Sequence, residues 1–180
     1  MLRCVRLLLV FLPAATSLPR VYATAHAAGQ AASAFADQTN ADIAPLASGV
    51  VESVSGLIDP TTGVFQAPRD GVYLIRGSVQ FACLAGGCVL EQAWLYLSKK
   101  EVGGSWVLTG SGGIMDGTSA AYVYDVMGAG DNVHNLSFNY VEELTAGDQL
   151  KMVGRAKSSG GSTWLWSVAG STYMHVISVD

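Results

Sequence analysis

Very few side chains of this 180-residue chain have the spacing that catalysis requires. A serine-hydrolase elbow needs Gly-x-Ser-x-Gly on a strand-to-helix turn, and the nearest approach, Gly-Thr-Ser-Ala-Ala at 117–121, lacks the final glycine. Glu142 and Glu143 are adjacent, so on a strand their carboxylates point to opposite faces and cannot act together as a glycosidase pair. We interpret them as solvated residues of a strand edge and predict no enzymatic activity.

Metal-ligating residue types are present, but they are scattered. The chain has three widely spaced histidines: His26, His134 and His175. We interpret them as ordinary histidines, because folding would have to gather them before they could bind a metal. Three aspartates in or beside glycine-rich loops offer oxygen ligands: Asp116, Asp125 and Asp131. They lack the Asp-x-Asp-x-Asp spacing of a calcium loop, so we expect no cofactor and keep calcium as the alternative.

The charge balance excludes binding to nucleic acid as the main activity. The chain has 10 Lys plus Arg against 14 Asp plus Glu, and only 13% of its residues are charged. Without the first 17 residues, which include two arginines, 8 basic and 14 acidic residues remain, and the net charge is −6. Such a chain repels phosphates. The longest cationic feature is Lys99-Lys100, which we interpret as a solvated strand end or turn.

The amino-terminal residues are organised differently from the remainder. A short basic stretch, MLRCVR, precedes the apolar run LLLVFL, and small residues follow Pro13. This is the three-part pattern of a secretory signal, and the alternative is an uncleaved arm packed against a partner. The apolar run is much shorter than the roughly 20 residues of a membrane-spanning helix, so we predict no membrane span. Residues 1–17 are therefore a signal or arm, and 18–180 form one domain.

Two cysteines lie close together beyond this segment. Cys83 and Cys88 are separated by Leu-Ala-Gly-Gly, and the two glycines allow the chain to turn back sharply. A tight return would bring the α-carbons within disulfide distance, which suits an oxidising compartment. The sequence leaves two interpretations open: a Cys83–Cys88 disulfide, or two small buried thiols.

Hydrophobic periodicity predicts an all-β protein. Runs rich in Val, Ile, Tyr, Phe, Trp and Thr are interrupted every 8 to 12 residues by Gly, Asp, Asn or Pro. Strands are expected within 20–24, 43–57, 63–67, 72–82, 89–98, 106–109, 120–126, 135–144, 149–156 and 173–179. In the fourth, Tyr73, Ile75, Gly77, Val79 and Phe81 share the face expected to be core. About ten strands without a sustained helix predict a sandwich or jelly roll of two antiparallel sheets.

Three segments resemble the tumour-necrosis-factor-like and complement-head-like jelly rolls. The first is TTGVFQAPRDGVYLI at 61–75, which joins a Thr-Gly turn, an aromatic residue, a Pro–Gly turn and a Val-Tyr strand. The others are VEELTAGDQL at 141–150, with its Gly-Asp turn before a late strand, and the closing strand STYMHVISV at 171–179. The opening LPRVYATA at 18–25 is more similar to the phage and bacterial members.

The resemblance implies a compact homotrimer on the surface of an extracellular particle. Its phage and bacterial members occur on virions as head fibres, decoration proteins or fibre tips. We expect a structural or recognition role in a virion surface, in contact with other virion or surface proteins. The alternative is a secreted binding module for a carbohydrate or protein ligand. The chain has no Gly-X-Y collagen stalk, so a collagen-borne immune protein is not expected.

Aromatic residues support self-association. Four tryptophans and seven tyrosines exceed what a single small β core readily hides, and surplus aromatics tend to line subunit interfaces. Trp164 and Trp166 share one face of an expected strand, so both indoles lie either inside the barrel or at a neighbour's surface. With Tyr173 they form the predicted interface or ligand platform.

Overall fold

The computed structural model describes residues 19–27, 39–83, 89–108, 120–124, 133–159, 164–166 and 171–179. These residues form thirteen β-strands in two antiparallel sheets, and no helix occurs among them. The predicted all-β sandwich is confirmed. Two strands, β2 and β4, are two-residue pairings that periodicity did not single out, because a run of two residues has no detectable alternation.

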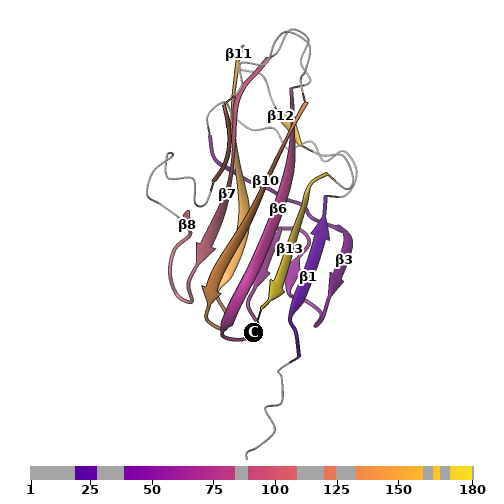
Figure 1. The fold of residues 1–180 in the computed structure, drawn as a ribbon, viewed down its shortest axis with the longest axis vertical. Helices are drawn as coiled ribbons and strands as arrows, with labels where there is room; N and C mark the ends of the chain where they lie inside the picture. Colours follow the sequence, from indigo (N-terminus) through magenta and orange to yellow (C-terminus); the bar gives the residue numbers. More distant parts are fainter. Residues whose placement is uncertain are drawn as a thin grey trace, which may run out of the picture.

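Sheet A has the strand order β10-β6-β13-β1-β3, and the short β12 also pairs with β6. Its strands are β1 (Tyr22–His26), β3 (Ser48–Glu52), β6 (Gly71–Cys83), β10 (Val133–Leu144), β12 (Trp164–Trp166) and β13 (Tyr173–Ser178). The five strands of the main path lie side by side in Figure 1. The first and last strands of the sequence are hydrogen-bonded neighbours, so both ends of the described domain meet in this sheet.

Sheet B has the order β4-β5-β11-β7-β8, with β2 beside β11 and β9 beside β7. Its strands are β2 (Ala41–Asp42), β4 (Ile58–Asp59), β5 (Val64–Gln66), β7 (Val89–Lys100), β8 (Val107–Leu108), β9 (Ala120–Tyr124) and β11 (Gln149–Ser159). Its longest pairing is β7 with β11, which has a register shift after Lys157. Sheet B supplies Leu95, Leu97 and Met152 to the core shared with sheet A.

The predicted core face of β6 is confirmed. Tyr73, Ile75, Val79 and Phe81 are fully buried, whereas Arg76, on the opposite face, is exposed. Alternation along a pleated strand produces this pattern because successive side chains point to opposite sides of the sheet. The face that contains Arg76 is consequently the outward face of sheet A.

Gly77 allows the two sheets to approach closely. A β-carbon built on Gly77 would lie 2.5 Å from Phe138 Cε1 and 2.6 Å from Met152 Sδ. Phe138 stands directly opposite Gly77 on β10, and Met152 comes from β11 of the other sheet. Glycine is needed here because a larger residue would displace either the aromatic ring or the methionine.

The Gly-Asp turn before β11 is held by its own aspartate. Asp148 is buried, and its carboxylate accepts hydrogen bonds from the backbone N–H groups of Thr145 (3.0 Å) and Val102 (3.2 Å). Gly147 has φ +92°, which glycine adopts without steric cost. The turn is also bonded to Ala67, whose N–H donates to Asp148 O at 2.9 Å. The motif at 141–150 therefore has a structural role, since its aspartate holds the turn in place.

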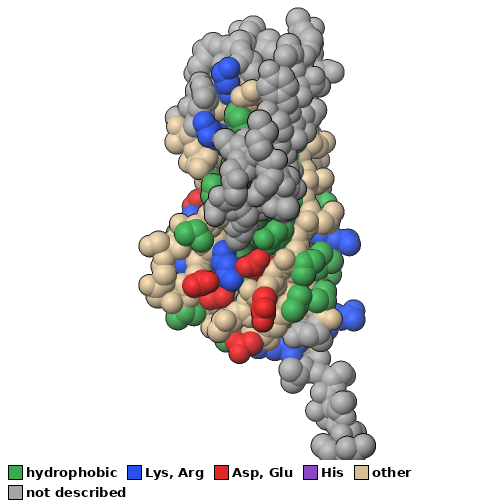
Figure 2. Space-filling view, turned by 60° about the vertical axis from the view of Figure 1, so that its left-hand side comes forward, with side chains coloured by type: hydrophobic (Ala, Val, Ile, Leu, Met, Phe, Trp, Pro, Cys, Tyr) green, Lys and Arg blue, Asp and Glu red, His purple; other side chains and the backbone are tan. Residues whose placement is uncertain are grey.

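Two predictions about charged residues were wrong. Lys99 was interpreted as a solvated strand end and Glu142 as edge solvation, but their side chains are only 14% and 18% exposed. Lys99 Nζ donates to Glu142 Oε1 at 3.0 Å and lies 3.7 Å from Asp148 Oδ2. The bridge joins β7 of sheet B to β10 of sheet A, and sheet packing, not sequence spacing, brings the charges together. Figure 2 shows charges of both signs gathered on the lower part of the molecule.

Candidate functional site

The outward face of sheet A contains an apolar row that crosses four strands. Tyr22 of β1 stands opposite Ile177 of β13, which stands opposite Leu74 of β6, and Leu74 stands opposite Val141 of β10. Tyr22 is 42% exposed and Val141 59% exposed at the two ends, and Leu74 and Ile177 are half-buried. Sheet A thus presents a continuous apolar strip to solvent. Strips of this kind mark interaction surfaces.

The next row on the same face is polar and basic. Thr24, His175, Arg76 and Asn139 stand in register across β1, β13, β6 and β10. Arg76 and Asn139 are exposed, whereas His175 is half-buried. This row therefore places a guanidinium directly beside an imidazole.

A third row places a histidine and a tyrosine beside His175 of the second row. His26 stands opposite Tyr173, and the ring centroids of these residues are 5.8 Å apart. The His175 ring lies 4.5 Å from that of Tyr173 and 5.6 Å from that of His26. Folding therefore brings His26 and His175 together although they are remote in sequence, because strands β1 and β13 pair. We call His26, Tyr173 and His175 the histidine cluster.

The environment of His175 favours its neutral form. Burial lowers the pKa of this imidazole, and the positive charges of His26 and Arg76 lower the pKa further. His175 Nε2 is buried without a hydrogen-bond partner among the described residues. Space for the cluster comes from Gly49 of β3, where φ is +58° and an added β-carbon would lie 3.2 Å from His26 Cδ2.

The outward face of sheet B contains a buried aromatic cluster. Trp94, Tyr96 and Val153 form a second buried cluster there, and the Arg155 guanidinium lies 5.0 Å from the centre of the Trp94 ring. Burial raises the pKa of Tyr96 against the opposing effect of Arg155. Trp94 is only 5% exposed, so it is not part of the aromatic surplus that the sequence suggested for an interface.

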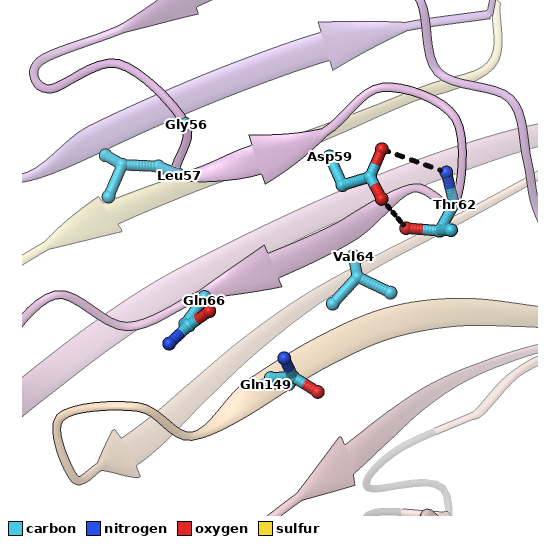
Figure 3. Close-up of a pocket in the computed structure, with 7 residues that line it drawn as sticks. All are labelled: Gly56, Leu57, Asp59, Thr62, Val64, Gln66 and Gln149. Carbon is cyan, nitrogen blue, oxygen red and sulfur yellow. Dashed lines mark hydrogen bonds between the residues drawn. The ribbon is translucent and has the colours of Figure 1, made fainter.

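A small cavity of about 260 Å³ lies beside β4, β5 and the start of β11 (Figure 3). Its lining residues are Gly56, Leu57, Asp59, Thr62, Val64, Gln66 and Gln149. Gln66 and Gln149 are cross-strand partners, so two carboxamides lie together on this wall. Among these residues Asp59 alone ionises.

Asp59 closes the turn that forms one wall of the cavity. Its carboxylate accepts hydrogen bonds from Thr62 Oγ1 at 2.7 Å and from the Thr61 N–H at 2.8 Å, and these bonds lower its pKa. The dashed lines in Figure 3 show its bonds to Thr62. Both carboxylate oxygens of Asp59 accept these hydrogen bonds, so Asp59 stabilises the turn. The cavity therefore presents the side-chain amides of Gln66 and Gln149 for hydrogen bonding, and its lining residues contain no acid–base pair.

The predicted site residues are only partly within the described structure. Tyr173 lies on the outward face of sheet A, separated from the apolar row by His175 of the second row. Trp164 and Trp166 belong to β12, with Trp166 opposite Phe81 of β6, but their side chains lie outside the described part, and their role stays a prediction. The Cys83 side chain and all of Cys88 are likewise outside it. The candidate calcium ligands are outside it as well: Asp116, Asp125 and Asp131.

Sequence comparison gives no relative, whereas structural comparison does. No protein family and no curated protein matches the sequence. Among solved structures, Eiger TNF from S. frugiperda superposes with a TM-score of 0.58 at 12% identity, covering 91% of this chain and 94% of the other. Murine APRIL at pH 5.0 superposes with a TM-score of 0.55 at 11% identity, covering 89% of this chain and 100% of the other.

These similarities concern the fold. At 10–12% identity they extend to the two-sheet β architecture and to no particular side chain. The described residues also contain no helix of the length and hydropathy that a membrane crossing needs. The chain therefore has the TNF-like jelly-roll fold that the three sequence segments predicted.

Proposed function

We propose that this protein is a non-enzymatic homotrimer of an extracellular particle, assembled through the outward face of sheet A. The setting that the sequence supports is a virion surface, where the trimer acts as a capsid, decoration or fibre-head component in contact with other surface proteins. The observation that carries the proposal is the apolar row of Tyr22, Ile177, Leu74 and Val141.

The physical reason is the cost of leaving this row in water. Burial of apolar area contributes about 25 cal/mol per Å². In a closed cyclic assembly this sheet face can be covered in every copy, so that no copy leaves it exposed to water. The resemblance to TNF-like jelly rolls supports a three-fold arrangement.

The test is the mass of the assembled chain. In sedimentation velocity or multi-angle light scattering, the full chain should have three times its monomer mass of 18.8 kDa. The Val141→Arg variant should be monomeric, because it places a charge in the apolar row that trimerisation would have to desolvate. Circular dichroism should show that this variant retains its β-sheet spectrum.

Val107→Arg is the matched control. Val107 lies on β8 of sheet B and is 57% exposed, close to the 59% of Val141, so the two substitutions place the same charge at equally exposed valines on different sheets. The control should remain a trimer. A monomeric wild-type protein, or equal effects of both variants, would contradict assembly through sheet A.

A secreted binding module is the second candidate function, and the cavity between Gln66 and Gln149 favours it. Paired carboxamides beside Leu57 and Val64 suit a neutral ligand rich in hydroxyl groups, such as a carbohydrate. Mass spectrometry of the natural amino terminus separates the two settings. An intact Met1 in purified particles would support the virion surface and contradict secretion by cleavage, whereas cleavage near residue 17 would support a secreted module.

A further inference from the structure

We propose that the histidine cluster makes assembly through sheet A sensitive to pH, so that trimers stable at neutral pH separate in mildly acidic surroundings. The inference rests on the proposed function, because it assigns a means of regulation to the same face. Three observations carry it: the packing of His26 against His175, their position on the same outward face as the apolar row, and the charges around them.

The cluster lies within the surface that assembly would cover. Tyr173, His175 and Ile177 all lie on the outward side of β13, so the rings of His175 and then Tyr173 follow Ile177 of the apolar row along this strand. On β1, Thr24 lies between Tyr22 of the apolar row and His26 on the same face. A partner that covers this face from the apolar row to the third row would also remove water from the imidazoles.

The groups around the imidazoles contribute positive charge. From β6, Arg76 stands opposite His175, and from β13 the ring of Tyr173 lies beside both imidazole rings. Across β1, the β3 position opposite His26 is Ser48. The β10 position beyond Arg76 is Asn139. These neighbouring positions, all within the described strands, contain no carboxylate.

The acids nearest along the strands are directed elsewhere. The Glu52 carboxylate of β3 accepts a hydrogen bond from the Gly56 N–H at 2.8 Å and another from the Ile58 N–H, so it is held in the following turn. On β10, Glu143 stands opposite Val72, and the apolar row lies between this pair and the histidine cluster. Protonation of both imidazoles would thus place three positive charges together without a compensating acid in the neighbouring positions.

The direction of the pH effect follows from these charges. Imidazoles gain a proton as pH falls through about 6.5, and covering a charged imidazole costs more than covering a neutral one. Assembly that lowers a histidine pKa by one unit is weakened about tenfold for each protonated site below that range. The trimer should be tightest above the ordinary histidine pKa and weaken as the pH falls below it.

The experiment is sedimentation of the full chain at about pH 8 and about pH 5.5, at constant ionic strength and with EDTA to remove metal ions. We expect trimers at the higher pH and at least tenfold weaker association at the lower pH, with an unchanged far-ultraviolet circular dichroism spectrum. The double variant His26→Gln/His175→Gln should stay trimeric at both pH values. His175→Phe keeps a ring and should retain assembly with a reduced response.

His134→Gln is the matched control, because His134 is the remaining histidine and stands opposite Phe81, far along β6 from Arg76. This variant should keep the full pH response. A wild-type trimer that is equally stable at both pH values would overturn the inference and leave the proposed function intact. A monomer at both values would overturn the proposed function. Dissociation accompanied by unfolding, or lost in His134→Gln, would overturn the assignment to the cluster.

Discussion

Replacement of Gly77 by alanine should destabilise the sandwich although it adds only one methyl group. The new β-carbon would meet Phe138 Cε1 at 2.5 Å, Met152 Sδ at 2.6 Å and Phe138 Cζ at 2.6 Å. All three distances are far below the 3.5–4.0 Å optimum for non-bonded contacts. The ring belongs to the neighbouring strand and the sulfur to the facing sheet, so both must move to make room.

Two opposing effects determine how much the Gly77→Ala substitution lowers the free energy of unfolding. Overpacking of a core costs about 1–3 kcal/mol, whereas replacing glycine restricts the unfolded chain and returns about 0.4–1 kcal/mol. The net loss should be about 1–2 kcal/mol in the free energy of unfolding, or roughly 2–8 °C in melting temperature for a domain of this size. Urea denaturation at one fixed protein concentration measures it, since association contributes to stability.

A second substitution tests the steric reason. In the Gly77→Ala background, Phe138→Leu removes the two ring atoms that the methyl group meets and leaves Met152 Sδ, so the double variant should be more stable than the sum of the single effects predicts. Gly56→Ala is the contrasting case, because its φ of +85° makes alanine unfavourable while no atom lies within 4 Å. Phe138→Leu should not rescue it. A Gly77→Ala protein as stable as the wild type would refute the reasoning.

Three further predictions concern other positions. Lys99→Met should lower the free energy of unfolding by about 2 kcal/mol at neutral pH, because two carboxylates lose their cation, and the loss should shrink as the pH rises through the raised pKa of Lys99 and the wild-type ammonium group is deprotonated; an effect that does not change with pH in this range would contradict this. Ser178→Ala should cost about 1–3 kcal/mol in urea denaturation, since the buried hydroxyl accepts the Val21 N–H at 2.9 Å. If Cys83 and Cys88 form a disulfide, the unfolded, unreduced protein should titrate neither thiol; two reactive thiols would contradict the bond.

The pKa of Lys99 explains the expected pH dependence of that variant. Burial by itself lowers the pKa of this ammonium group, but the hydrogen bond and charge of Glu142, with Asp148 and Glu101, outweigh burial and raise it. The lysine therefore keeps its charge to a higher pH than an ordinary lysine. The contribution of the bridge is complete below the ordinary lysine pKa and is lost as the pH rises through the raised pKa of Lys99.

Local sequence determined the strands and their faces. Alternation from Tyr73 to Phe81 was sufficient to identify the core side of β6, because the pleat gives side chains a period of two that does not depend on other strands. Turn residues such as Gly147 and Asp148 could also be recognised, since a positive φ and a short acceptor side chain act within a few residues. The all-β sandwich follows from these local signals.

Only the tertiary structure decided which residues meet across strands and sheets. His26 and His175 come together because β1 pairs with β13, and Lys99 meets Glu142 because β7 packs against β10. Neither contact has a signature in sequence spacing, since register and sheet packing are set by the burial of the whole core. The apolar row has the same origin: four ordinary strand residues become one continuous surface only when their strands align.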